Sequence, residues 1–147
     1  MASHTVAEGA WIGAPASRVY GILADYRNGH PRILPKEFNY LAVERGGVGA
    51  GTVIAFSMRA FGTTRQSRAA ITEPVPGRIL METLLDGSGV VTTFTVDAGA
   101  VAGSDVTIST VIPVSSGILG RLERWVAERY LRGVYRKELA LLAGVAA

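Results

Sequence analysis

The side chains of this 147-residue chain that could do chemistry are few. Tyr26 and His30 lie in a segment rich in turn formers, Arg65 lies in a strand-like run, and Glu138 lies near the end of a long helical segment. A histidine can move protons near neutral pH because its reference pKa is about 6.5. An arginine can anchor a carboxylate or an enolate, and a buried glutamate can act as a general base. These four residues are the candidate catalytic groups.

Each candidate also has a structural interpretation. A histidine in a loop can simply be solvated, and an arginine at the end of a strand can be exposed. Glu138 lies among apolar residues of the helical segment, and a buried carboxylate needs a partner or a raised pKa. It is therefore either a general base or half of an ion pair with an arginine. Tyr135 could donate its hydroxyl to a ligand or pack in the core with its tip near water.

The sequence predicts neither a metal site nor a cofactor. The two histidines, His4 and His30, are far apart, and there are no cysteines for disulfides or thiolate chemistry. The glycine-rich segment 46–51 leads from one strand-like run to the next and lacks the Lys-Ser/Thr ending of a phosphate-binding loop. We interpret it as a flexible hairpin loop that could gate a cavity mouth.

Glu138 lies in the longest segment of the chain with a helical period, so this predicted helix determines where its side chain points. It is a helix predicted from Ser116, a plausible N-cap, to Gly144, and it would span on the order of 40 Å. On its core-facing side the second half carries bulky residues, whereas the first half carries small ones. Two interpretations remain open. The helix is kinked near residues 126–130 so that both halves pack, or a gap beneath its first half is a ligand cavity.

Strand-like runs fill most of the rest of the chain. A strand over Thr5–Ile12 is followed by a short helix from Pro15 to about Asp25 and by the turn-rich segment 26–35, which has room for only a turn or two of helix. Six more strands are predicted over Tyr40–Arg45, Thr52–Phe61, Arg65–Thr72, Arg78–Leu84, Val90–Asp97 and Asp105–Val114. Short connections imply antiparallel hairpins, so we predict one α+β domain over residues 1–147, with a curved seven-stranded sheet around the long helix.

In each strand one alternating set of side chains is more apolar, and we assign that set to the concave face. The fourth strand is ambiguous, and choosing Ser67, Ala69 and Ile71 as its inner set also turns Arg65 inward. The expected ligand-binding residues are the most apolar members of these faces together with two helix residues: Ile54, Phe56, Met58, Ile79, Met81, Phe94, Val96, Val106, Ile108, Val134 and Tyr135.

The segment from Ile12 to Tyr26 (IGAPASRVYGILADY), with the order of elements, resembles the START-like superfamily, which includes polyketide cyclase/dehydrase, lipid-transfer and birch-pollen-allergen-like proteins. The segments 51–54 (GTVI) and 71–74 (ITEP) are similar to it as well. The resemblance implies a helix-grip fold with two short helices after the first strand and a cavity between sheet and C-terminal helix. It implies binding of sterols, lipids, quinones, hormones or aromatic polyketides, but no catalytic motif spans the superfamily.

The composition of the chain limits the cellular location and the kinds of partner that we expect. Hydrophobic residues make up 48% of the chain and charged residues 18%, and no run is long and apolar enough to span a bilayer or to resemble a signal peptide, so we expect a cytoplasmic protein. The net charge of +3 resides in the long helix, and three charges are too few to indicate a nucleic-acid partner.

Three hypotheses of function follow. The first is binding of a small hydrophobic molecule, such as a lipid, a quinone or a polyketide-like compound, in the cavity. The second is a polyketide aromatase/cyclase acting in the same cavity through Tyr26, His30, Arg65 or Glu138. The third is an interaction module in which Ile118, Leu122 and Trp125 form an exposed patch for membrane contact or for a homodimer.

Overall fold

The computed structural model describes residues 3–60, 62–113 and 118–147, and for residues 118–124 the backbone only. The strands in these residues are β1 (Ser3–Ile12), β2 (Phe38–Arg45), β3 (Val53–Ala60), β4 (Thr63–Val75), β5 (Ile79–Leu84), β6 (Val91–Ala98) and β7 (Ser104–Pro113). The helical segments are α1 (Ala16–Ala24), a 3-10 helix η1 (His30–Ile33) and α2 (Ile118–Ala146). The predicted cap at Ser116 and the predicted strand ends at Phe61 and Val114 lie outside the described residues.

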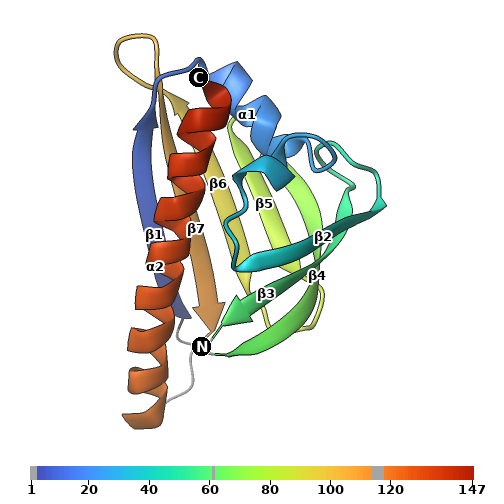
Figure 1. Ribbon diagram of the computed structural model, residues 1–147, viewed down its shortest axis with the longest axis vertical. Coiled ribbons are helices and arrows are strands. Elements are labelled where there is room, and N and C mark those ends of the chain that lie inside the picture. The colour runs from blue at the N-terminus through green and yellow to red at the C-terminus, as the bar shows by residue number, and fades with distance from the viewer. Residues whose placement is uncertain (1–2, 61, 114–117) are drawn as a thin grey trace.

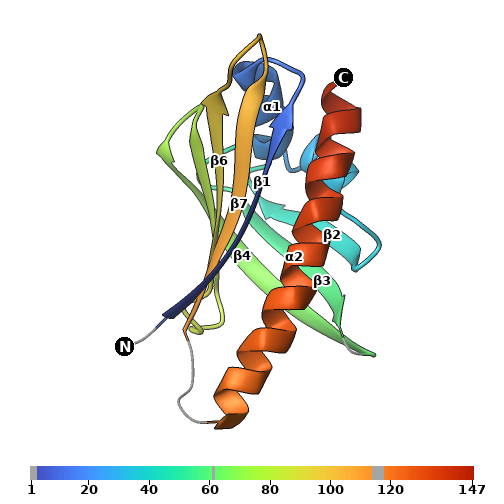
Figure 2. The ribbon, with the colours of Figure 1, turned by 90° about the vertical axis from the view of Figure 1, so that its left-hand side faces the viewer.

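The strands form one antiparallel sheet in the order β1-β7-β6-β5-β4-β3-β2. Each strand from β3 to β7 pairs with the strand before it in the chain, as short hairpin connections require, whereas β1 pairs with β7 and β2 forms the other edge. The sheet curves around α2, with β1 and β7 on one side of the helix and β2 and β3 on the other (Figures 1 and 2). The predicted α+β helix-grip architecture is confirmed.

Helix α2 runs without interruption for 29 residues and has no sharp bend (Figures 1 and 2), so of the two interpretations left open the kink near residues 126–130 is not observed. Its second half packs tightly, because Val134, Leu139 and Leu142 are buried in the main core. Within the described part of the chain, no helix has the length and apolar character needed to cross a membrane.

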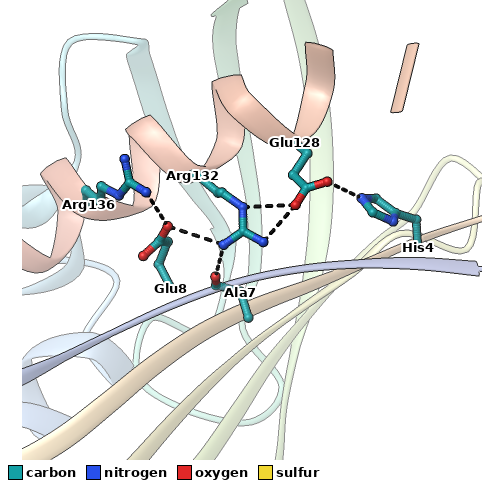
Figure 3. Close-up of polar contacts among 6 residues, drawn as sticks. All are labelled: His4, Ala7, Glu8, Glu128, Arg132 and Arg136. Atoms are coloured by element: carbon teal, nitrogen blue, oxygen red, sulfur yellow. Dashed lines mark hydrogen bonds and ion pairs between the residues drawn. The ribbon is translucent and has the colours of Figure 1, made fainter. Parts of the chain in front are cut away.

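Ion pairs fasten α2 to the edge strand β1 (Figure 3). Arg132 binds Glu128 one turn away with both Nε and Nη2, at 3.0 and 2.7 Å, and its Nη1 reaches Glu8 of β1 at 3.4 Å. Arg136 Nη2 lies 3.0 Å from the same Glu8 oxygen, and His4 Nε2 lies 3.1 Å from Glu128. Arg132 in particular holds the pKa of Glu128 below its usual range. These contacts close the β1 side of the space beneath the helix.

The glycine-rich loop 46–51 joins β2 to β3 as predicted, but hydrogen bonds hold it in place. The Gly49 amide donates to the Ala24 carbonyl at 2.9 Å, and the Ala50 amide donates to Glu73 Oε1 at 2.8 Å. The expectation of a flexible loop over a cavity mouth is therefore wrong, because the loop is tied to the end of α1.

The inner and outer faces of β5 are opposite to the prediction. Leu80 is fully buried and lies opposite Phe94 of β6 on the concave face, whereas Ile79 and Met81 point to the convex face. Glu82, which alternates with Ile79 and Met81 and so was expected on the convex face, therefore points inward together with Leu84. Both alternating sets of β5 are apolar, so the pattern alone could not determine the face.

The face of β5 can be tested by stability. Leu80→Ala is expected to lower the free energy of unfolding by about 2–5 kcal/mol, because it removes a fully buried side chain and leaves a void. Met81→Ala, the matched control one residue away, should cost clearly less, since Met81 is only partly buried. Urea denaturation of both variants measures the difference. Equal losses would contradict the assigned faces.

Candidate functional site

A cavity of about 630 Å³ lies between the concave face of the sheet and α2. Its walls are mainly apolar, and they come from β2 to β7, from the segment before β2 and from α2. The apolar lining residues are Leu34, Phe38, Leu41, Ile54, Phe56, Met58, Ala60, Leu84, Val90, Phe94, Ile112, Ala127 and Leu131, with the ring of Tyr130. Its helical wall includes Ala127, a small residue of the half that the sequence predicted to leave a gap.

Apart from Ser67 of β4, the polar residues of the cavity lie at two different ends. Thr63 and Arg65 are exposed and lie near the start of β4, at the open end. The buried end contains a larger polar group, comprising His30, Glu82, Thr92, Thr110, Tyr135 and Glu138. Arg65 therefore lines the same cavity as the other candidates but is separated from them by the apolar walls.

A tight turn after α1 positions the residues of the buried end. Asp25 organises it, because its side chain accepts the Asn28 amide at 3.0 Å and its carbonyl accepts the amides of Gly29 and His30 at 2.9 and 2.7 Å. A Cβ atom at Gly29 would lie 2.4 Å from the Ile22 carbonyl oxygen, so only glycine permits this close approach.

Tyr26 and His30 meet at Glu82. The Tyr26 hydroxyl donates to Glu82 Oε2 at 2.6 Å, and the two rings of Tyr26 and His30 stack with centroids 4.4 Å apart. His30 Nδ1 donates to the Leu23 carbonyl at 2.7 Å, which leaves Nε2 facing Glu82 Oε2 at 3.6 Å. Burial and the neighbouring Glu82 raise the pKa of Tyr26 well above its usual value. Tyr26 thus remains a hydrogen-bond donor.

Glu138 is the unusual group of the site. Only 3% of the residue is exposed, and its Oε2 has no hydrogen-bond partner among the described residues. Burial, with the charge of Glu82 as a second cause, raises the pKa of Glu138 well above its usual value. No arginine pairs with it in the described part of the chain, so the predicted alternative of a structural ion pair is wrong.

A chain of hydroxyl groups completes the buried end. The Tyr135 hydroxyl is hydrogen-bonded to Thr110 Oγ1, which lies 2.8 Å from Thr92 Oγ1. Burial, more than the nearby charge of Glu138, raises the pKa of Tyr135 to about 12. Tyr135 therefore keeps its proton at neutral pH and contributes a neutral hydroxyl to the cavity wall.

The expected ligand-binding residues fall into three groups. Five of them line the cavity: Ile54, Phe56, Met58, Phe94 and Tyr135. Four are buried in the solid core beyond the cavity: Val96, Val106, Ile108 and Val134. Two, Ile79 and Met81, point to the opposite face of the sheet, for the reason given above. The concave assignments for the third, fourth, sixth and seventh strands agree with the structure.

Glu82, the residue around which Tyr26 and His30 converge, was not among the predicted site residues. The available signal was a carboxylate two residues from Leu80 and two from Leu84, on one alternating set of the strand. Leu34, in the segment before β2, and Phe38, the first residue of β2, contribute to the apolar wall and were not predicted either.

Two further expectations concern other parts of the chain. Trp125 is 57% exposed, with the Arg129 guanidinium 5.1 Å from its ring centre, whereas the side chains of Ile118 and Leu122 lie outside the described residues. The predicted homodimer or membrane patch therefore stays a prediction. No group of three or more metal-ligating side chains occurs within the residues the structure describes.

The fold and the cavity define a helix-grip protein of the START-like class. Residues 3–147 match the family described as polyketide cyclase / dehydrase and lipid transport, and the chain belongs to that family. None of the curated proteins compared with this chain matches it significantly in sequence.

Solved structures share the fold over the whole chain. The KanY protein, determined in solution by NMR, has a TM-score of 0.86 and 28% identity, with 100% of each chain covered. The Zhui aromatase/cyclase from a Streptomyces species has a TM-score of 0.76 and 16% identity, covering 99% of this chain and 94% of its own. A START superfamily protein from Mycobacterium smegmatis has a TM-score of 0.74 and 14% identity, with 97% of each chain covered.

The unpaired carboxyl of Glu138 should make the protein less stable than it could be. Glu138→Leu is expected to raise the free energy of unfolding by about 1–3 kcal/mol at pH 8, because leucine removes a buried polar group that lacks a partner. The gain should be smaller at pH 5. Above the usual glutamate pKa the unfolded wild type releases a proton that the folded wild type retains, so wild-type stability falls as the pH rises.

Urea denaturation at both pH values provides the measurement. Glu128→Leu is the control, because it removes a carboxylate of the same helix that is paired with Arg132, and it should destabilise the protein. Destabilisation by Glu138→Leu at both pH values would mean that Glu138 has a stabilising partner, contrary to this interpretation.

Proposed function

We propose that the protein binds a small, largely hydrophobic molecule in the cavity between the sheet and α2, with its polar end toward Glu138 and its apolar body toward Phe56 and Met58. The observation that carries the proposal is a cavity of about 630 Å³ with mainly apolar walls and, at its inner end, a buried acid whose Oε2 has no hydrogen-bond partner among the described residues. Ligand sites combine apolar walls with a few placed polar groups in this way.

The size and the wall chemistry support this function. The volume lies within the range of about 300–1,000 Å³ that is usual for small-molecule sites. Met58, Leu41 and Leu131 are flexible or branched aliphatic side chains that can adjust to a ligand of irregular shape. The exposed Thr63 and Arg65 lie where a ligand would enter.

The relatives support a ligand of the same general kind. The family includes, by its description, polyketide cyclases and lipid-transport proteins, and the Zhui protein is an aromatase/cyclase. For this chain we propose a lipid, a quinone or a polyketide-like molecule. A cytoplasmic location and the absence of a nucleic-acid partner remain predictions from the sequence.

A specific observation favours catalysis as a second candidate function. His30 and Glu138 line the same buried end of the cavity, and Tyr26 reaches it through its hydrogen bond to Glu82. Tyr26, His30 and Glu138, three of the four candidate catalytic residues, thus gather at the buried end of one cavity. An aromatase/cyclase would require such a cluster. Arg65 lies at the exposed end and would at most contact the outer part of a ligand.

Ligand binding can be tested by filling the cavity. Ala127→Trp places an indole in the apolar part of the cavity and is expected to weaken binding of the neutral fluorescent probe phenylnaphthylamine at least about tenfold, or about 1.4 kcal/mol. Ala140→Trp, on an exposed position of the same helix, is the matched control and should bind like the wild type. Fluorescence titration measures both variants.

Native mass spectrometry of the purified protein complements the titration by detecting any apolar molecule that remains bound. Wild-type protein that does not enhance the fluorescence of the probe, or equal binding by the Ala127→Trp variant, would contradict the proposed site.

A further inference from the structure

Polar side chains form a row across the middle of an otherwise apolar concave face. Glu82, Thr92 and Thr110 are direct register neighbours on β5, β6 and β7. On either side of this row the concave face is apolar, with Leu80 and Leu84 flanking Glu82 along its own strand. An apolar binding wall does not need a carboxylate in its centre, and burying one is costly. Binding of an apolar ligand alone therefore does not explain why Glu82 lies in the centre of this face.

The second carboxyl group approaches the row from the helix. Glu138 lines the same cavity, its Oε2 has no partner among the described residues, and the charge of Glu82 contributes to its raised pKa. The two carboxyl groups therefore line one cavity from opposite walls, Glu82 from β5 and Glu138 from α2. Glu138 is kept as a neutral acid, which can donate a hydrogen bond and a proton to an oxygen atom of a bound molecule.

Glu82 is in a different environment. Its Oε2 accepts the Tyr26 hydroxyl at 2.6 Å and lies 3.6 Å from His30 Nε2, so two neighbours from the segment after α1 fix the position of this oxygen. The titratable groups that face the two carboxyls are Tyr26 and His30 from the segment after α1, and Tyr135 from α2. Tyr26 and Tyr135 both have raised pKa values, so neither is an additional negative charge near neutral pH.

We infer that Glu138 and Glu82 act as an acid and a base on a carbonyl group at the buried end of the ligand, interconverting its keto and enol forms. The inference rests on the proposed function, because it requires an apolar ligand in the cavity, and it adds that the ligand is a ketone with hydrogen atoms on the adjacent carbon. One carboxyl group that can donate a proton and a second that can accept one, in the same pocket, are the arrangement that such proton transfer needs.

The step balances without a further reactant. The Glu82 carboxylate removes a proton from the carbon next to the carbonyl, and the electrons of the broken C–H bond form the C=C bond. The carbonyl oxygen takes the proton of Glu138, so the ketone becomes an enol, Glu82 becomes protonated and Glu138 becomes ionised. The reverse step returns a proton to the carbon. If Glu82 exchanges its proton with D₂O in between, deuterium enters the ligand.

Wild-type protein is therefore expected to accelerate deuterium uptake by β-tetralone, an apolar aromatic ketone, by about 100-fold or more over buffer at the same pH. Uptake at the carbons beside the carbonyl is followed by proton NMR in D₂O. Binding is measured separately, by displacement of phenylnaphthylamine. Glu82→Gln and Glu138→Gln should each lower the uptake rate at least about tenfold while still binding β-tetralone, since glutamine keeps the shape but cannot transfer the proton.

The matched control is Glu44→Gln, which removes a strand carboxylate that is paired with Arg68 on the outside of the protein. It should retain the wild-type rate. A thermal melt of each variant establishes that it is folded. If either Glu82→Gln or Glu138→Gln does not fold, the other variant still tests the inference.

Tyr26 acts through Glu82 and is a positioning residue, so its test separates the uptake rate from binding. Tyr26→Phe removes the hydrogen bond that holds Glu82 Oε2 in place, and it should lower the uptake rate of bound β-tetralone at least about threefold while the affinity for β-tetralone stays unchanged. A purely structural role would weaken binding together with the rate.

The outcomes separate the two proposals. Binding of β-tetralone without accelerated uptake, binding of phenylnaphthylamine but not of β-tetralone, or wild-type rates in both site variants would each overturn the acid–base inference and leave ligand binding in place. Failure of the wild type to bind either probe would overturn the proposed function itself.

Discussion

A straight helix cannot follow a curved sheet along its whole length, and the rest of the structure depends on this mismatch. The second half of α2 lies against the core through Val134, Leu139 and Leu142, whereas its first half faces the cavity through Ala127 and Leu131. A kink would have let both halves pack and would have closed this space. The ion pairs of Glu8 with Arg132 and Arg136 hold the helix along β1, on one side of the cavity.

The same packing makes a costly group tolerable. Burying Glu138 without a partner reduces stability, but the residue lies between Tyr135 and Leu139, in the tightly packed half of the helix. The favourable burial of these neighbours offsets the cost locally, so the helix remains folded around an acid that an optimised core would not contain. Groups that lower stability in this way are typical of functional sites, where activity and stability make opposing demands.

The fold could be predicted from the sequence because its signals are local. A 3.6-residue period over about 29 positions, two-residue alternation between short turns, and a Pro-led helix after the first strand each specify an element without reference to the rest of the chain. The face of β5 could not be predicted, since Ile79 and Met81 are as apolar as Leu80 and Leu84. Glu82 faces inward because Tyr26 contacts it from a distant turn, and alternation within one strand contains no information about such a contact.

The cavity was harder to predict than the face that lines it, because core and ligand walls use the same side chains. Ile108 and Phe56 are both apolar and both concave, yet Ile108 is in solid packing and Phe56 faces open space. The two residues differ in their distance along the strands from the place where α2 leaves the sheet. The type of a side chain contains no information about that distance. Buried polar residues are more informative. A carboxyl such as Glu138, on the apolar side of a helix and without an arginine in reach, indicates space that a ligand can fill, because solid packing would have required a partner for it.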